Sequence, residues 1–180
     1  MTRISIVKRE QMNPEQGKVF DDCKAEGGPV AGPYYAYIRH PKLMRILQDS
    51  SNYLRSTGMT VRERQIAILR TVRFWGAAYP WAVQVRGSLA AGLDQHIVDA
   101  INAGKTPDLT DAREMAAYDV ATELLEKKGL SKATYDNAAK LFGDETLVAL
   151  VAQVGSFCMT CCTANGFDIT PPDDVPHRLK

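Results

Sequence analysis

Apolar side chains recur every three or four positions from about residue 14 onward, which places them on one face of each successive helix. Alternating runs of β-branched residues, which are typical of strands, are almost absent. The pattern therefore predicts an all-α protein. The expected helices cover residues 14–27, 41–55, 60–75, 80–91, 94–103, 110–128, 131–143 and 144–165.

Local signals mark the ends of several of these helices. Asn13-Pro14 is typical of a helix start, because Asn caps free N–H groups and Pro suits the first helical position. Thr60 and Glu63 have the spacing of a capping box, in which each side chain bonds to the other residue's backbone N–H. Glycines are expected to end most helices, including Gly129 after residue 128 and Gly143 before the last helix.

Length and charge narrow the class of protein. With 180 residues, of which 45% are hydrophobic, the chain can fill one core, so we expect a single domain over residues 1–180 with a polar C-terminal tail at 168–180. The 22 Lys and Arg against 21 Asp and Glu give no positive excess for binding nucleic acid. The N-terminus lacks the apolar run of a signal peptide, and no stretch of roughly 18 apolar residues stands out, so a cytoplasmic protein without a membrane segment is expected.

Two arginines lie among apolar positions of the helix over 60–75. Arg70 and Arg73 are surrounded by Ile66, Leu69 and Val72, so at least one guanidinium is expected against buried surface. A buried guanidinium requires an acceptor or an anionic ligand. Two interpretations stay open for Arg70: a clamp on a substrate carboxylate, or an ion pair with Glu63 on the same helix.

The segment around residues 79–101 resembles the carboxymuconolactone decarboxylase family, within the broad group that also holds the alkylhydroperoxidase D-like proteins. The resemblance implies packed antiparallel helices, a trimer or hexamer, and a ligand pocket near the subunit contacts. The residues that carry it are Tyr79-Pro80-Trp81-Ala82-Val83-Gln84-Val85-Arg86, Ala90-Ala91-Gly92-Leu93, Ile97 and Ile101, with Gly32-Pro33-Tyr34, His40-Pro41-Lys42-Leu43, Arg62-Glu63, Phe142-Gly143 and Asn165-Gly166-Phe167.

The sequence departs from this family at two positions. Many relatives have Glu where Pro80 stands and His where Gln84 stands, one helical turn apart, so that both side chains can act as an acid/base pair. Proline has no proton chemistry, and the Gln amide does not exchange a proton near neutral pH. Either other residues perform a different reaction, or the pocket has kept binding alone.

The leading hypothesis is a lyase or isomerase acting on a small carboxylated or lactone-type metabolite. Arg70 or Arg73 would hold the carboxylate, while Gln84 and Tyr79 would donate hydrogen bonds to the oxygen that gains charge. The proton carrier would be His40, Tyr35 or bound water. Trp81 lines the pocket or packs in the core, with neither favoured.

No cofactor is expected, because no flavin, nicotinamide, phosphate-binding or metal-binding motif is visible. The histidines, His40, His96 and His177, lack the spacing of metal ligands. The partners expected are therefore a small-molecule substrate and further copies of the chain.

A second hypothesis, from a different class of enzyme, is a thiol peroxidase. Cys158 and Cys161 have the Cys-x-x-Cys spacing of thiol redox sites. The same residues continue one helical face with Leu147 and Val154, which favours two small core residues. A third hypothesis is a noncatalytic binding or assembly module.

Overall fold

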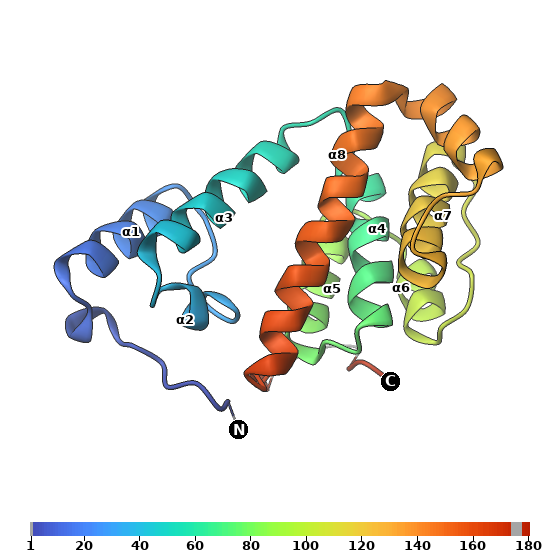
Figure 1. Ribbon diagram of the computed structural model, residues 1–180. Coiled ribbons are helices and arrows are strands. Elements are labelled where there is room, and N and C mark those ends of the chain that lie inside the picture. Colours follow the sequence, from blue (N-terminus) through green and yellow to red (C-terminus); the bar gives the residue numbers. More distant parts are fainter. Residues whose placement is uncertain (1, 174–177) are drawn as a thin grey trace.

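In the computed structural model, which describes residues 2–173 and 178–180, every regular element is helical. The sequence prediction of an all-α fold is therefore confirmed. Figure 1 shows an arm made of α1 to α3 beside a bundle made of α4 to α8. The elements are η1 (Arg9–Gln11), α1 (Pro14–Ala25), α2 (Tyr34–Tyr37), α3 (Pro41–Arg55), α4 (Val61–Phe74), α5 (Ala78–Ala90), α6 (Gln95–Asn102), α7 (Ala112–Lys127) and α8 (Lys132–Gly166).

The predicted caps explain where the helices begin. The Thr60 side chain accepts from the Glu63 N–H at 3.2 Å, and the Thr60 N–H donates to Glu63 Oε2 at 2.7 Å, so α4 begins with the expected capping box. Asn13 and Gln16 form the same reciprocal pair at the start of α1. The break predicted at Gly143 is a kink within α8, where this glycine has φ 72° and ψ 163°.

Two local predictions need correction. The left-handed residue after α7 is Lys128, with φ 64°, and not Gly129. Its Nζ donates to the Leu125 carbonyl and lies 5.1 Å from the centroid of the Phe74 ring, contacts that stabilise this backbone conformation. The short helix α2 was not expected, because a single helical turn gives too little periodicity to detect.

The described residues form three apolar clusters, two of which meet around α4. One cluster joins α4 to α7 and α8, and a second joins the other side of α4 to α5 and α6. The third lies within the arm and contains Cys23, Tyr37, Ile38 and Met44. The expected polar tail also contributes, because Ile169 is buried and Leu179 packs against the second cluster.

Two reciprocal ion pairs join the first turns of α4 and α7. Arg113 Nε donates to Glu63 Oε1 at 2.6 Å, and Arg62 Nε donates to Glu114 Oε1 at 2.5 Å. Both carboxylates are buried. Because both helices begin at these pairs, α4 and α7 run parallel, which departs from the antiparallel arrangement that the resemblance implied.

The apolar character of α8 is greater than the sequence analysis expected. The helix contains an 18-residue window of mean hydropathy 1.8 with at most two charged residues, so by length and composition it could cross a membrane. One face of the helix packs in the core through Leu147, Leu150, Val154 and Cys161. A core helix satisfies the same compositional criterion.

We predict that Arg113→Ala lowers the free energy of unfolding by about 3 kcal/mol, because it leaves the buried Glu63 carboxylate without its ionic partner. Arg9→Ala, which breaks an ion pair with Asp21 between solvent-exposed side chains, is the matched control and should destabilise the protein far less. Urea denaturation measures both. Equal losses would show that the buried pair has no special role.

Candidate functional site

The two arginines singled out in the sequence line one cavity. It lies between α4, α6 and α7 and has a volume of about 510 Å³. Its lining is rich in polar side chains from α4 and α7. The lining residues are Arg70, Arg73, Phe74, Ile101, Gly104, Thr106, Tyr118, Asp119, Thr122 and Glu126.

Arg70 is held against α7. Its side chain is 11% exposed, its Nε donates to Thr122 Oγ1 at 3.0 Å, and its Nη2 forms an ion pair with Glu126. The alternative pairing of Arg70 with Glu63 is wrong, because Glu63 binds Arg113. Seven residues along one helix separate Arg70 from Glu63 by about 10 Å, whereas α7 lies directly beside α4.

Arg73 is anchored at one atom only among the described residues. Its Nε donates to the carbonyl oxygen of Asn102 at 2.8 Å, at the end of α6. This carbonyl belongs to the negative end of the helix dipole, which favours a cation. The two terminal amino groups of Arg73 remain able to bind a carboxylate in the cavity.

Asp119 is an acidic residue of this cavity that the sequence analysis missed. Although Asp119 is an exposed residue, partial desolvation raises the pKa of its carboxyl group, and the negative charge of Glu123 raises it further. A carboxyl group with a raised pKa is better suited to carry a proton near neutral pH. On α7, the only sequence signal for this site is the polar Thr122 beside the apolar face of the helix.

Gln84 and Tyr79 lie on α5, outside the lining of the arginine cavity. Gln84 is half-buried, and its backbone carbonyl oxygen accepts from Ser88 Oγ at 2.8 Å. The Tyr79 ring packs on Gly32, where an added Cβ would meet the ring at 2.1 Å. Burial raises the pKa of Tyr79, and the neighbouring Tyr35 raises it further.

Trp81 and Pro80, the other two α5 residues considered in the sequence, are both buried. Trp81 is fully buried in the second cluster, although it also borders a cavity of about 330 Å³ against the tail. Pro80 lies in the first turn of α5, where its missing N–H costs little. The replacement of the family glutamate at this position is therefore compatible with the helix.

His40 and Tyr35 line two further cavities. His40 is exposed at the start of α3 and borders a cavity of about 240 Å³ with Tyr37 and Thr163, whose hydroxyl groups are hydrogen-bonded at 2.8 Å. Tyr35 borders a cavity of about 250 Å³ within the arm. The structure thus brings Arg70 and Arg73 together but places the other predicted side chains elsewhere.

The two cysteines of the Cys-x-x-Cys pair pack in different apolar clusters. Cys158 packs against the cluster with α7, whereas Cys161 is fully buried in the cluster with α5 and α6. Burial raises the pKa of Cys161 to about 12, with smaller effects from Cys158 and Cys162. This environment disfavours the thiolate that attacks a peroxide.

No group of three or more His, Cys, Asp and Glu side chains that could hold a metal ion occurs among the described residues. His96 is exposed. His177 lies outside the residues that the structure describes.

No protein-family model matches the sequence, and no curated protein matches it. Solved structures match along nearly the whole chain. A peroxidase-related protein from Silicibacter has a TM-score of 0.77 and 16% identity, covering 99% of this chain and 96% of its own. The chain has the alkylhydroperoxidase D-like fold.

Two further solved structures with this fold have names that refer to an enzyme activity. A peroxidase-related protein from Ralstonia eutropha, described as an alkylhydroperoxidase D core, has a TM-score of 0.76 and 15% identity, covering 96% of this chain and 93% of its own. A debrominase in complex with 2,3,4-tribromopyrrole has a TM-score of 0.77 and 15% identity, covering 96% of this chain and 93% of its own. The alkylhydroperoxidase D-like fold therefore includes a named enzyme.

We predict that Gly32→Ala lowers the free energy of unfolding by about 3 kcal/mol, because it combines a left-handed backbone with a clash against the Tyr79 ring. Gly27→Ala is the matched control. Gly27 has a similar φ, 72° against 67°, but open space around its added Cβ, so its cost should be about 1 kcal/mol. Equal losses in urea denaturation would show that Tyr79 does not pack on Gly32.

We predict that iodoacetamide at pH 8 modifies the exposed Cys162 quickly and leaves the buried Cys161 unmodified in the folded protein. Both thiols lie on the tryptic peptide 141–178, so tandem mass spectrometry with fragmentation between residues 161 and 162 distinguishes them, with urea-unfolded protein as the control for full labelling. Rapid modification of Cys161 would contradict its place in the core.

Proposed function

We propose that this protein binds a small carboxylated metabolite in the cavity between α4, α6 and α7 and performs cofactor-free acid/base chemistry on it. One observation carries the proposal: Arg73, with its terminal amino groups available, and Asp119, with a raised pKa, line the same cavity of about 510 Å³. This volume falls within the range of about 300–1,000 Å³ usual for small-molecule sites.

Arg73 is the carboxylate-binding residue in this proposal. Its planar guanidinium can donate two parallel hydrogen bonds to one carboxylate. Arg70 is not the carboxylate-binding residue, because Glu126 already balances its charge. The Arg70 Cζ lies 5.8 Å from the centroid of the Phe74 ring, and Phe74 and Tyr118 supply apolar surface for the body of the ligand.

Asp119 is the proposed proton carrier. In its ionised form it removes a proton from a carbon next to the carboxylate or lactone carbonyl, and in its protonated form it returns that proton to the product. Return of the proton to another carbon gives an isomerase reaction. In a lyase reaction the carbon–oxygen bond breaks as the double bond forms, and the protonated Asp119 gives its proton to the departing oxygen. Because the ionised form starts the reaction, activity should fall as the pH drops through the raised pKa of Asp119.

This proposal keeps the carboxylate-binding part of the sequence hypothesis and replaces its catalytic residues. The named ligand of the debrominase, 2,3,4-tribromopyrrole, is a small ring, which supports a ligand of similar size here. Two of the other structures are called peroxidase-related, but no observation on Cys158 and Cys161 favours a thiol peroxidase.

Isothermal titration calorimetry with benzoate, and with uncharged benzamide as the ligand control, tests the binding step. Arg73→Ala should weaken benzoate binding at least tenfold, since a charged hydrogen bond contributes about 1.5–3 kcal/mol. Lys132→Ala removes an exposed cation far along the chain and should have no effect. Unchanged benzoate affinity in Arg73→Ala would refute the proposed site.

Asp119→Asn tests the catalytic step. The variant should bind benzoate as the wild type does and lose at least a hundredfold in turnover of carboxylated lactones, the scale of one general acid/base residue. A protein that binds carboxylates through Arg73 but converts none of a broad panel would instead be a binding module.

A further inference from the structure

Asn102 is a buried polar residue that joins parts of the chain far apart in the sequence. Its side-chain Nδ2 donates to the backbone carbonyl of Arg178 at 3.0 Å, and its Oδ1 accepts from the backbone N–H of Lys180 at 3.1 Å. Its own backbone carbonyl accepts from Arg73 Nε at 2.8 Å. With only 3% of its surface exposed, Asn102 therefore links the C-terminal tail to the arginine of the proposed site.

The end of α6 explains why this backbone carbonyl can bind Arg73. The last carbonyls of a helix have no partner within the helix. The N–H groups of Ala103, Gly104 and Lys105 bond to carbonyls further up α6, so Asn102 has the first carbonyl that no backbone N–H of the described residues occupies. An added Cβ at Gly104 would lie 3.9 Å from Arg73 Nη2. The guanidinium thus caps α6 at the negative end of its dipole.

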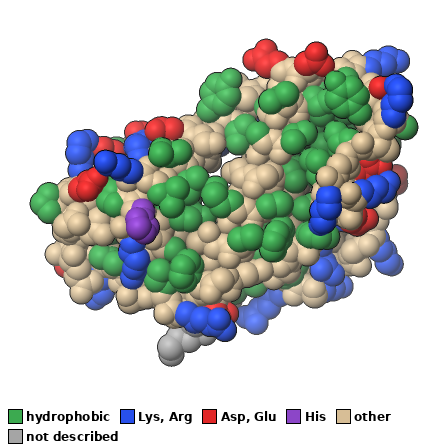
Figure 2. All heavy atoms as spheres, viewed as in Figure 1, with side chains coloured by type: hydrophobic (Ala, Val, Ile, Leu, Met, Phe, Trp, Pro, Cys, Tyr) green, Lys and Arg blue, Asp and Glu red, His purple; other side chains and the backbone are tan. Residues whose placement is uncertain are grey.

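The end of the tail is anchored by its backbone and by one apolar side chain. Leu179, between the two residues that bond to Asn102, packs against the second apolar cluster. Arg178 and Lys180 are exposed, and Figure 2 shows Lys and Arg side chains along the lower edge of the molecule. A neutral change at Asn102 or Leu179 should therefore release residues 178–180.

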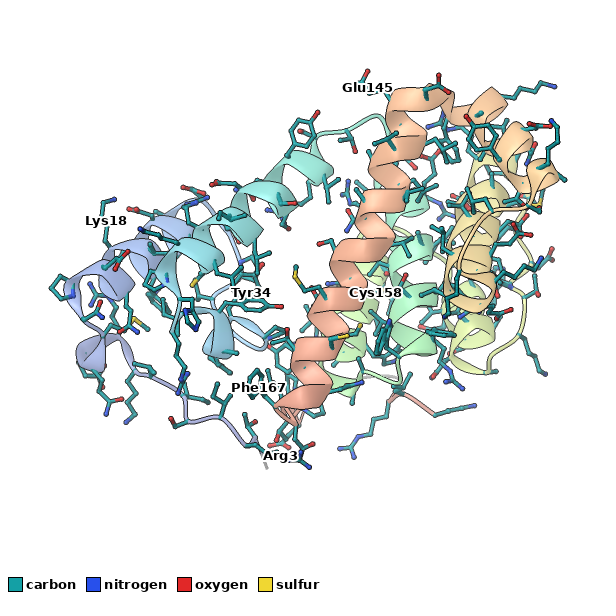
Figure 3. The ribbon with its side chains drawn as sticks, in the orientation of Figure 1. Arg3, Lys18, Tyr34, Glu145, Cys158 and Phe167 are labelled. Atoms are coloured by element: carbon teal, nitrogen blue, oxygen red, sulfur yellow. The ribbon has the colours of Figure 1, made fainter. Side chains whose placement is uncertain are left out.

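A separate contact holds the beginning of the tail. Ile169 is buried, and the backbone N–H of Arg3 donates to the carbonyl of Phe167 at 2.8 Å. Figure 3 shows Arg3 and Phe167 together at the end of α8. Release of residues 178–180 should therefore leave α8 and the start of the tail in place.

We propose that Asn102 is a positioning residue for Arg73, and that docking of residues 178–180 on its side chain sets the affinity of the cavity for a carboxylate. This inference rests on the proposed function. Docking engages both polar groups of the Asn102 amide, which holds the last turn of α6 and its carbonyl in place. Without the tail this end of a short helix would fray, as helix ends with few tertiary contacts do.

Release of the tail should act on ligand binding at two places in the cavity. Arg73 would lose the acceptor that fixes its Nε, and the cost of ordering a mobile arginine on the ligand weakens binding by roughly twofold to tenfold. Ile101 and Gly104, at the same end of α6, line the cavity and would move with it. Carboxylate binding should thus weaken although no residue that lines the cavity has been changed.

Two uncharged variants test the link between the tail and Arg73. Asn102→Ala removes both side-chain hydrogen bonds to the tail, and Leu179→Ser removes the apolar anchor. The Nε–H signal of Arg73 in NMR spectra of isotope-labelled protein, identified by its loss in Arg73→Ala, reports on this arginine without a ligand. Its exchange with water should be about tenfold faster or more in both variants. Titration calorimetry with benzoate should show binding weaker by roughly twofold to tenfold.

Ser88→Ala is the matched control for loss of a buried polar side chain. Ser88 is fully buried on α5, and its Oγ donates to the Gln84 carbonyl at 2.8 Å and to Gln65 Oε1 at 3.1 Å. This variant should leave both the Arg73 exchange rate and the benzoate affinity unchanged. The double variant with both tail changes should bind benzoate no more weakly than the weaker single variant, since both changes remove the same contact. Circular dichroism melting checks that all variants fold.

The outcomes separate this inference from the proposed function. Wild-type exchange of the Arg73 Nε–H in both tail variants, or an equal effect of Ser88→Ala, would overturn the inference. So would unchanged benzoate affinity in both tail variants, although the proposed function would then stand if Arg73→Ala still abolished binding. Failure of the wild type to bind benzoate would refute the proposed function and the effect on affinity, while the exchange rates would still decide whether the tail positions Arg73.

Discussion

The reciprocal ion pairs between α4 and α7 determine the geometry on which the candidate site depends. Each helix begins with a capping residue followed two and three positions later by Arg and Glu: Arg62 and Glu63 on α4, Arg113 and Glu114 on α7. Because each arginine binds the other helix's carboxylate, the two helices are held in parallel and in register. The carboxylates at both N-termini also stabilise the aligned helix dipoles.

The parallel register of α4 and α7 also determines the contacts of Arg70, two turns further along α4. Arg70 meets Thr122 and Glu126 because α4 and α7 advance together from their paired first turns. One more turn places Arg73 at the end of α6, where the Asn102 carbonyl fixes its Nε. The cavity thus has one arginine whose charge is balanced and one that remains able to bind an anion. A ligand carboxylate is the group that best completes this arrangement.

The helices could be predicted because their signals are local. Thr60 with Glu63, Asn13 with Pro14 and the break at Gly143 each involve residues within one turn of one another. The structure has a helix start at the first two and a kink within α8 at the third. The helical periodicity predicted the all-α class, and the resemblance implied the alkylhydroperoxidase D-like fold, which solved structures at 15–16% identity confirm.

The site could be predicted only in part, because its partners come from helices that are distant in sequence. The spacing in the sequence identified Arg70 and Arg73 but could not show that Glu126 is the partner of Arg70, since that depends on the α4 to α7 register. Asp119 carries no distinguishing sequence pattern. For the same reason the two apolar faces of α8 could not be assigned, since periodicity shows which positions are apolar but not what covers them.

The central claim is that the cavity between α4, α6 and α7 holds a carboxylate beside Arg73. A crystal structure of the protein soaked with benzoate tests it most directly. We expect the benzoate carboxylate within hydrogen-bond distance of the terminal amino groups of Arg73, with the ring against Phe74 or Tyr118. Benzoate bound instead beside Gln84 and Tyr79, with the arginine cavity empty, would contradict the account and return the site to α5.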